Sequence, residues 1–270
     1  MSNYNHYREN DLNLEQSANN TLLIQVSSDS FSYAVTGDNR LLAISENVNI
    51  NELTNPSEEN GLLSANYKQC IIGLPQNGFT FIPVSLFKSD LIANFAHFLD
   101  VREDEKVFSQ PFDSENQVIY KVDGSMLTAL AERFDLRNPV FSAKGWIMAL
   151  AANNPTDHEL YINIDKAKVE LLNFKANQLR FYNSFEFLNE DELAYFTSLV
   201  IDELQLQPQD ITLVLSGDID TGDKNFNRLM EFFRRVNLSN LRILDLPEQI
   251  SSHTILKLTA LSLCGSSEVG

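Results

Sequence analysis

The amino-acid sequence predicts an α/β protein built from two similar lobes, each with a mixed sheet flanked by helices. Three observations support this prediction. Alternating apolar and polar residues between Leu22 and Ser45 are typical of three short strands joined by tight turns. The same arrangement begins again at Leu160. A nearly continuous apolar run at 211–215 then indicates a buried parallel strand in the second lobe.

Length and charge limit what the chain can be. Its 270 residues, 43% of them hydrophobic, are enough for two lobes with a sizeable core. The formal net charge of −17 disfavours nucleic acid, whose phosphates would be repelled, and unspecific binding to anionic membranes. The acidic surface therefore serves solubility or attracts a basic protein partner.

The N-terminus and the cysteines bear on location. Residues 1–20 are polar and lack the apolar core of a signal peptide, so we predict a disordered N-terminal segment. No run approaches 18 consecutive apolar residues, so no transmembrane helix is expected. Cys70 and Cys264 lie in apolar surroundings, which is typical of buried free thiols in a reducing cytoplasm. We therefore expect a cytoplasmic protein.

The first lobe is expected to continue from its meander into further strands and helices. Gln76-Asn77-Gly78 lies between two apolar runs and predicts a hairpin of strands 70–74 and 79–82. After Pro83 the apolar spacing predicts a helix with one broad buried face. The other expected elements are strands at 106–110, 117–122 and 140–142, and helices that begin at Gly124 and Gly145.

The second lobe repeats this order. After its meander, Asn189 and the acidic residues that follow it predict the capped start of a long helix, because carboxylates favour the positive end of the helix dipole. The remaining expected elements are a strand at 211–215, a helix through 226–233, a strand at 241–245 and a helix at 252–263. We therefore divide the chain into the N-terminal segment 1–20 and two lobes, 21–155 and 156–270.

The two meanders align with each other without a gap. When Leu23–Ser45 is placed over Tyr161–Asn183, apolar residues coincide in all three strands. The turn residues Asn39 and Asn177 also coincide. Any two amphipathic meanders can align to some degree, and chance remains the alternative to duplication. We favour duplication because strands, turns and the elements that follow them agree.

This architecture and two phrases resemble known proteins. A meander followed by helix, strand, helix and strand is similar to the ribonuclease-H-like unit, and two such units in tandem resemble the actin-like ATPase superfamily. Type IV pilus assembly and type II secretion members contain segments similar to FLNEDELAYFTSLVIDELQLQPQDITLVLSGDID and FTFIPVSLF. Over roughly residues 20–265 the chain resembles the Bacteroidetes family called domain of unknown function 3822.

The resemblance implies an ATP site with magnesium, with an Asp-x-Gly loop at the first turn of each meander. The first turn here has Ser27 and a displaced Asp29, without glycine. The second keeps Asp165, but Ala167 stands where glycine is expected. The adenosine-side loop retains one glycine, Gly217, followed by acids. We therefore predict no catalytic residues and no ATP hydrolysis, and we assign Asp165 and Gly217, with Ser27 and Asp29, to a vestigial nucleotide cleft.

Three functions are consistent with these features. The first is a non-catalytic actin-like module that binds another protein, with the phenylalanine-rich segment 79–99 as contact surface unless those rings are core. The second is a nucleotide-binding switch with a degenerate ATP site between the lobes. The third, a ribonuclease-H-type nuclease, needs carboxylates around two metals, and the first meander offers Asp29 alone. No metal site is expected, because the histidines show no ligand spacing.

Overall fold

The computed structural model describes residues 6–53, 58–75, 77–136 and 139–265. They form two compact units, an N-terminal unit of residues 6–144 with 264–265 and a C-terminal unit of residues 145–263. The division thus falls between Lys144 and Gly145 rather than at 155. The helix that begins at residue 144 therefore belongs mainly to the C-terminal unit. Among the described residues, no helix is both long and apolar enough to cross a membrane.

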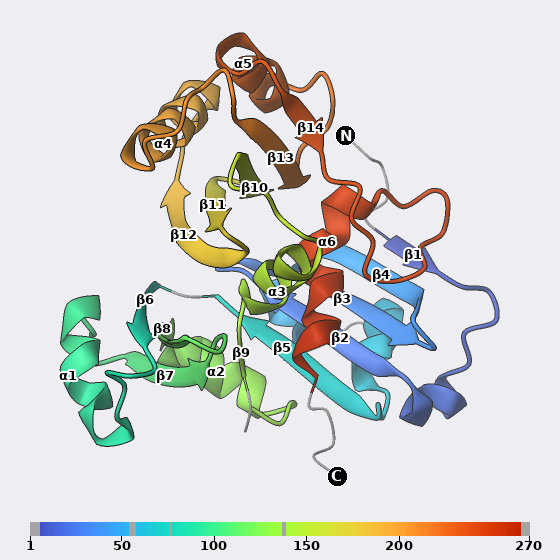
Figure 1. The fold of residues 1–270 in the computed structure, drawn as a ribbon. Helices are drawn as coiled ribbons and strands as arrows, with labels where there is room; N and C mark the ends of the chain where they lie inside the picture. Colours follow the sequence, from blue (N-terminus) through green and yellow to red (C-terminus); the bar gives the residue numbers. More distant parts are fainter. Residues whose placement is uncertain (1–5, 54–57, 76, 137–138, 266–270) are drawn as a thin grey trace. The chain divides into compact units, whose positions relative to one another are not determined.

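The main sheet of the N-terminal unit has the order β1-β4-β3-β2-β5-β9 (Figure 1). β2, β3 and β4 form the predicted antiparallel meander, β5 runs parallel to β2, and β9 runs parallel to β5. The strands are β1 (His6–Arg8), β2 (Thr21–Val26), β3 (Ser30–Gly37), β4 (Arg40–Asn49), β5 (Gln69–Leu74) and β9 (Val140–Phe141).

Part of the segment predicted to be disordered is ordered. Strand β1 pairs antiparallel with β4, and the 3-10 helix η1 (Leu14–Asn19) begins at Asn13, whose side chain accepts a hydrogen bond from the Glu15 N–H at 2.9 Å. Polar composition was misleading here because β1 is held by backbone pairing at a sheet edge, which needs no apolar side chains. Residues 1–5 lie outside the described residues.

A second, three-stranded sheet of order β6-β8-β7 belongs to the same unit. The predicted hairpin of 70–74 with 79–82 is wrong, because β5 joins the main sheet in parallel with β2 whereas β6 pairs antiparallel with β8. The long helix expected after Pro83 is instead one short helix between two 3-10 turns. The elements are β6 (Gly78–Pro83), η4 (Ser89–Leu91), α1 (Ile92–Ala96), η5 (His97–Leu99), β7 (Glu105–Pro111), β8 (Asn116–Asp123) and α2 (Gly124–Ala131).

The C-terminal unit contains one sheet of order β12-β11-β10-β13-β14, with β13 and β14 parallel to β10 (Figure 1). The last strand is Val236–Leu238, so the strand predicted at 241–245 is wrong. The elements are α3 (Lys144–Ala152), β10 (Glu159–Asp165), β11 (Lys168–Lys175), β12 (Gln178–Glu186), α4 (Glu190–Glu203), β13 (Thr212–Gly217), α5 (Lys224–Phe232), β14 (Val236–Leu238), α6 (Ser252–Ala260) and η6 (Leu261–Cys264).

The repeat predicted from the sequence extends to backbone detail. Without β1, both main sheets share one order, a three-stranded meander followed by two parallel strands. The second turn of each meander has two left-handed residues, Asp38 and Asn39 (φ 50° and 63°) in one and Ala176 and Asn177 (φ 50° and 63°) in the other. Such turns match the twist of a hairpin. The predicted duplicated fold is confirmed.

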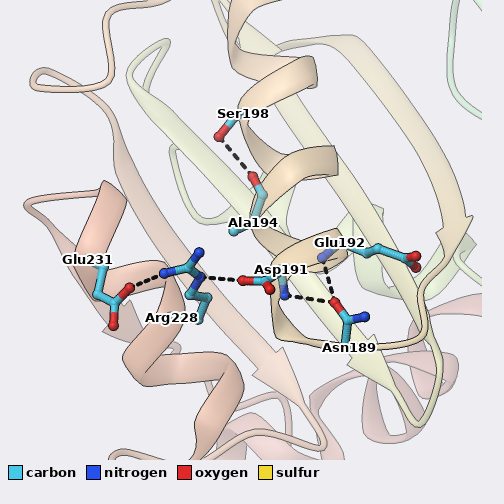
Figure 2. A network of polar contacts seen from close by, with 7 residues as sticks. All are labelled: Asn189, Asp191, Glu192, Ala194, Ser198, Arg228 and Glu231. Carbon is cyan, nitrogen blue, oxygen red and sulfur yellow. Dashed lines mark hydrogen bonds and ion pairs between the residues drawn. The ribbon is translucent and has the colours of Figure 1, made fainter.

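Helices α4 and α5 cover one face of the C-terminal sheet, and the core lies between them and the strands. Asn189 caps α4 by accepting hydrogen bonds from the N–H groups of Asp191 and Glu192 (Figure 2). Arg228 on α5 pairs with Asp191 at 2.7 Å and with Glu231 (Figure 2). The core includes Ile162, Leu171, Leu193, Leu215 and Leu229.

Candidate functional site

Asp165 and Gly217, two residues assigned to a vestigial nucleotide cleft, lie at adjacent strand ends in the C-terminal unit. Asp165 ends β10 and stands opposite Lys168 across a tight turn. Gly217 ends β13, next to Ile164 in the parallel register. The structure therefore brings together the two residues that the sequence suggested for this lobe.

The geometry of Gly217 is explained by its own sheet. Its φ is +88°, and a Cβ atom at this position would lie 2.0 Å from the carbonyl oxygen of Ile164. The next N–H, that of Asp218, donates to the same oxygen at 2.7 Å. Glycine is required here for close approach of β13 to β10, so it carries no evidence of phosphate binding.

Carboxylates surround this strand end. Partial desolvation and the nearby carboxylate of Asp165 raise the pKa of Asp218, and Asp223 and Asp220 add to the effect. Asp223 also caps α5, where its side chain accepts hydrogen bonds from Phe226 N–H at 2.7 Å and from Asp220 N–H at 2.9 Å. A side-chain carboxylate thus takes the helix end at which an anion could otherwise bind.

Ser27 and Asp29 lie in the corresponding turn of the N-terminal unit. Ser27 N–H donates to Ser30 O at 2.8 Å, and the Ser30 hydroxyl donates to the Asp29 carboxylate at 3.2 Å. Ile50 N–H donates to Asp29 O at 3.3 Å and ties the turn to the end of β4. In the gapless alignment Ser27 corresponds to Asp165, so the acid of this turn is two positions from the expected one.

The residues present depart from the pattern that an ATP and magnesium site of this fold would need. The retained glycine is needed within the sheet, one turn has no acid at the expected position, and the other strand end concentrates negative charge. Within the described ranges, no group of three or more His, Cys, Asp or Glu side chains could hold a metal ion. A phosphate group at this strand end would lie near the carboxylates of Asp165, Asp218 and Asp220, which would repel it.

A buried polar network lies behind the Asp165 turn. Glu170, 1% exposed, receives hydrogen bonds from Tyr182 Oη at 2.6 Å and Asn163 Nδ2 at 2.9 Å. Lys257 Nζ on α6 lies 2.6 Å from the same carboxylate. Ser216 Oγ donates to Asn163 Oδ1 at 3.2 Å. Although burial alone would raise it, the charge of Lys257 holds the pKa of Glu170 below its ordinary value.

The N-terminal unit contains a pocket of about 460 Å³. It opens where the parallel strands β2 and β5 end, the position at which open α/β sheets bind ligands. The turn after β2, the 3-10 helix η2 (Ile50–Leu53), the segment after β5 and helix α2 form its walls. The lining residues are Ser28, Ile50, Asn51, Leu53, Pro75, Asn77, Asp123, Ser125, Met126, Ala129 and Leu130.

Apolar side chains form the larger part of the walls of this pocket, and Ser28, Asn51, Asn77, Asp123 and Ser125 add polar groups. Asp123 caps α2 by accepting hydrogen bonds from the Ser125 hydroxyl and from Met126 N–H at 2.9 Å, and these bonds lower its pKa. Asn77 is anchored by Glu105, which forms a buried ion pair with Lys121 at 2.8 Å. The pocket therefore combines apolar walls with polar groups that hydrogen bonds hold in place, which is typical of sites for small ligands or short peptide segments.

The phenylalanine-rich segment 79–99 divides between core and surface. Phe79 and Phe81 pack edge-to-face against Phe141, with ring centroids 5.5 and 6.3 Å apart. Phe98 is 80% exposed and Leu86 is 65% exposed. Most of these rings are therefore accounted for by packing within the unit.

Sequence reasoning did not find the pocket. It recognised the start of α2 at Gly124, but the walls come from four segments whose approach depends on pairing of β6 with β8 rather than with β5. A signal was present in Asp123, three residues before an apolar helical run, which is a helix-capping position. Capping alone does not indicate a cavity.

Comparison with protein families gives one match that spans most of the chain. The model described as "Protein of unknown function (DUF3822)" matches residues 9–236. None of the curated proteins matches.

Similar solved structures share the fold. A protein of unknown function with an actin-like ATPase fold from Bacteroides thetaiotaomicron has a TM-score of 0.76 and 23% identity, covering 94% of this chain and 99% of that one. A chain of the PilM–PilN type IV pilus biogenesis complex gives a TM-score of 0.64 and 11% identity, with 90% and 98% coverage. The cytoplasmic domain of EpsL, an inner-membrane component of the Vibrio cholerae type II secretion system, gives 0.51 and 13%, with 92% and 96% coverage.

Proposed function

Because this chain belongs to the DUF3822 family and has an actin-like fold, we propose that it is a non-catalytic module that binds a partner protein through the pocket of its N-terminal unit. The observation that carries the proposal is the mainly apolar pocket at the ends of β2 and β5, where Ser28 contributes part of the turn that an ATPase of this fold would use for phosphate. The occupant is a short peptide segment with apolar side chains.

The size and chemistry of the pocket support this occupant. A volume of about 460 Å³ lies within the range of ligand sites and accommodates a few side chains of a peptide. Leu53 and Leu130, both buried, provide apolar contact, while Asn77 and Asp123 can fix peptide groups by hydrogen bonds. One structural neighbour is a complex of two type IV pilus proteins, so a fold of this kind does assemble with another protein.

Charge favours a basic partner. The net charge of −17 would speed the encounter with a positively charged protein, most strongly at low salt. We further propose a cytoplasmic location. Its support is that Cys70 and Cys264 are both free thiols and that burial raises their pKa to about 12 and about 11, which keeps them unreactive.

The alternative is a nucleotide-binding switch. The adjacency of Asp165 and Gly217 favours it, but the requirement for Gly217 within the sheet and the carboxylates around Asp218 weigh against it. We therefore propose that ATP and magnesium play no part in the function.

Selection from a displayed library of random peptides on the purified protein tests the proposal. We expect enriched peptides to combine apolar residues with Lys or Arg. Ala129→Trp fills the pocket and should weaken their binding by roughly tenfold or more, since it replaces the space for an anchoring side chain. Ala131→Trp, on the exposed side of the same helix, is the matched control and should bind as the wild type does.

Two outcomes would overturn the proposal. Selected peptides that bind Ala129→Trp as tightly as wild type would place their site elsewhere. If no peptide is enriched while ATP with magnesium binds tightly in calorimetry, and Asp165→Ala abolishes that binding, the nucleotide switch replaces the present proposal.

A further inference from the structure

The outer edge of the C-terminal sheet offers a second surface, separate from the pocket. β12 is the terminal strand of this sheet, and within the described part of the chain no strand lies on its far side. An edge strand presents backbone donors and acceptors that can pair with another chain. Because the fold is duplicated, the same edge of the other sheet provides a direct comparison.

In the N-terminal unit this edge is occupied. β1 runs antiparallel to β4 with His6 opposite Ser45, and the His6 Nδ1 and Ser45 Oγ atoms are 2.7 Å apart. The Glu9 N–H extends the pairing by donating to Leu42 O at 2.8 Å. A very short extended segment is therefore sufficient to pair with this edge of the fold.

β4 and β12 each contain a β-bulge at the same position, and β1 pairs with β4 next to this bulge. The register shifts after Val35 in β3 and after Asn173 in β11, which leaves Leu42 unmatched in β4 and Arg180 unmatched in β12. These residues correspond in the gapless alignment of the two meanders. The bulge at Leu42 does not prevent strand addition to β4. β12 has the same bulge and lacks the second register shift that β4 has between Ser45 and Val48, so the edge of β12 is the more regular one.

The backbone N–H of Ser184 in β12 has a side-chain acceptor in place of a neighbouring strand. Hydrogen-bonded positions alternate along an antiparallel pair, so Glu46, four residues after Leu42, faces the β1 side of β4. The counterpart of Glu46 in β12 is Ser184. Its N–H donates to the side-chain oxygen of the adjacent Asn183 at 2.9 Å. A local side chain takes the donor that an added strand would use.

We propose that β12 binds an extended, basic segment of a partner polypeptide as an added antiparallel strand over residues 180–184. Carboxylates outnumber cations at this edge and favour a basic occupant. Glu186 ends β12 and the first turn of α4 contains Glu190, Asp191 and Glu192, whereas Lys168 stands opposite Glu186 and Arg180 donates to Leu204 O. Arg228 pairs with Asp191. The half-buried rings of Phe181 and Phe185 provide apolar contact for alternate side chains of the added strand. This surface goes beyond the pocket and does not depend on it.

Synthetic peptides of the length of β12 that alternate Lys with Val test this inference, with peptides that alternate Glu with Val as the charge control. We expect the basic peptide to bind and to protect the amides of 180–185 from hydrogen exchange. Ser184→Pro removes the outward N–H and should weaken binding by roughly tenfold or more, since proline cannot donate. Ser184→Ala keeps the N–H and should bind as the wild type does.

Circular dichroism of each variant checks that it folds. If Ser184→Pro does not fold, Glu186→Lys replaces it and should weaken binding of the basic peptide several-fold, to roughly one fifth, by reversing the local charge. Equal binding by the wild type and the folded variant, or no protection of β12 by any peptide, overturns the inference. Protection of β12 that rises with protein concentration in the absence of peptide also overturns it, because a second copy would then be the occupant.

Discussion

The two meanders of this protein have the same backbone arrangement and differ in their buried side chains. At equivalent positions the C-terminal meander has Asn163 and Glu170, which join a buried network with Lys257, whereas the N-terminal meander has Gln25 and Ser32. The Gln25 Oε1 atom is buried without a hydrogen-bond partner. At these positions the C-terminal copy has a charged, hydrogen-bonded network, and the N-terminal copy has no charged residue.

The strands that follow each meander differ in the same way. Gly217 is required by its contact with Ile164, and the last residue of the corresponding strand β5 is Leu74. After Leu74 the chain leads into the three-stranded sheet, and the pocket forms beside it. After Gly217 it leads into acidic residues and α5. Duplication thus conserved the framework, while the strand ends diverged toward a pocket in one unit and a closed, acidic surface in the other.

Removal of Lys257 should produce the largest effect. Lys257→Met leaves the carboxylate of Glu170 buried without its 2.6 Å partner and should lower the free energy of unfolding by about 3–5 kcal/mol. Arg40→Met, which removes the exposed Arg40–Glu9 pair of the N-terminal unit, is the control and should cost at most about 1 kcal/mol. Urea unfolding measures both. Equal losses would mean that the network is not what distinguishes the two copies.

Gly217→Ala should have the next largest effect. Alanine at position 217 would be strained at the positive φ of this residue, and its Cβ would collide with Ile164 O, so both effects oppose folding. Gly222 has nearly the same φ, +89°, but no atom lies within 4 Å of the place that a Cβ would take there, so Gly222→Ala should cost only about 1–2 kcal/mol. Thermal unfolding should rank Gly217→Ala as the less stable variant. The reverse order would contradict the packing role of Gly217.

Replacement of the equivalent polar residues Asn163 and Gln25 by apolar residues compares the two meanders further. Asn163→Leu removes a hydrogen-bond partner from both Ser216 and Glu170 and should cost about 1–3 kcal/mol, because unsatisfied buried groups are penalised. Gln25→Met removes an oxygen that has no partner and should change stability by less than about 1 kcal/mol, in either direction. Denaturant midpoints of the two variants test this, and a large loss from Gln25→Met would show that its side chain is satisfied in solution.

The smallest expected effect is a difference in acid stability. The folded-state pKa of Glu170 lies below its ordinary value of 4.5, so its stabilising contribution is complete above about pH 4.5 and is lost as the pH falls through the folded-state pKa. The double variant Glu170→Leu with Lys257→Met lacks this group. Unfolding followed from pH 7 to pH 3 should therefore show a shallower decline for the double variant, and identical slopes would contradict the assignment.

The sequence was sufficient to predict the features that depend on a local pattern of residues. Alternation placed both meanders, and the turn residues Asn39 and Asn177 fixed their register, because left-handed residues are needed there. Prediction from the sequence failed for features that depend on pairing between strands far apart in the chain. The hairpin at 76–78 had good turn chemistry, yet β5 found a parallel partner in β2. The pocket depends on that choice, so no local pattern could reveal it. Asp165 and Gly217 lie at adjacent strand ends because neighbouring parallel strands end at the same edge of a sheet, and their assignment to a nucleotide cleft stays a prediction.

Hydrogen exchange of the wild-type protein, with a library-selected peptide and separately with ATP and magnesium, tests the central claim most directly. We expect the peptide to protect the pocket segments 50–53 and 123–130 and ATP to leave the exchange of 165–168 and 217–223 unchanged. Protection of 165–168 and 217–223 by ATP, with no peptide effect at the pocket, would contradict it.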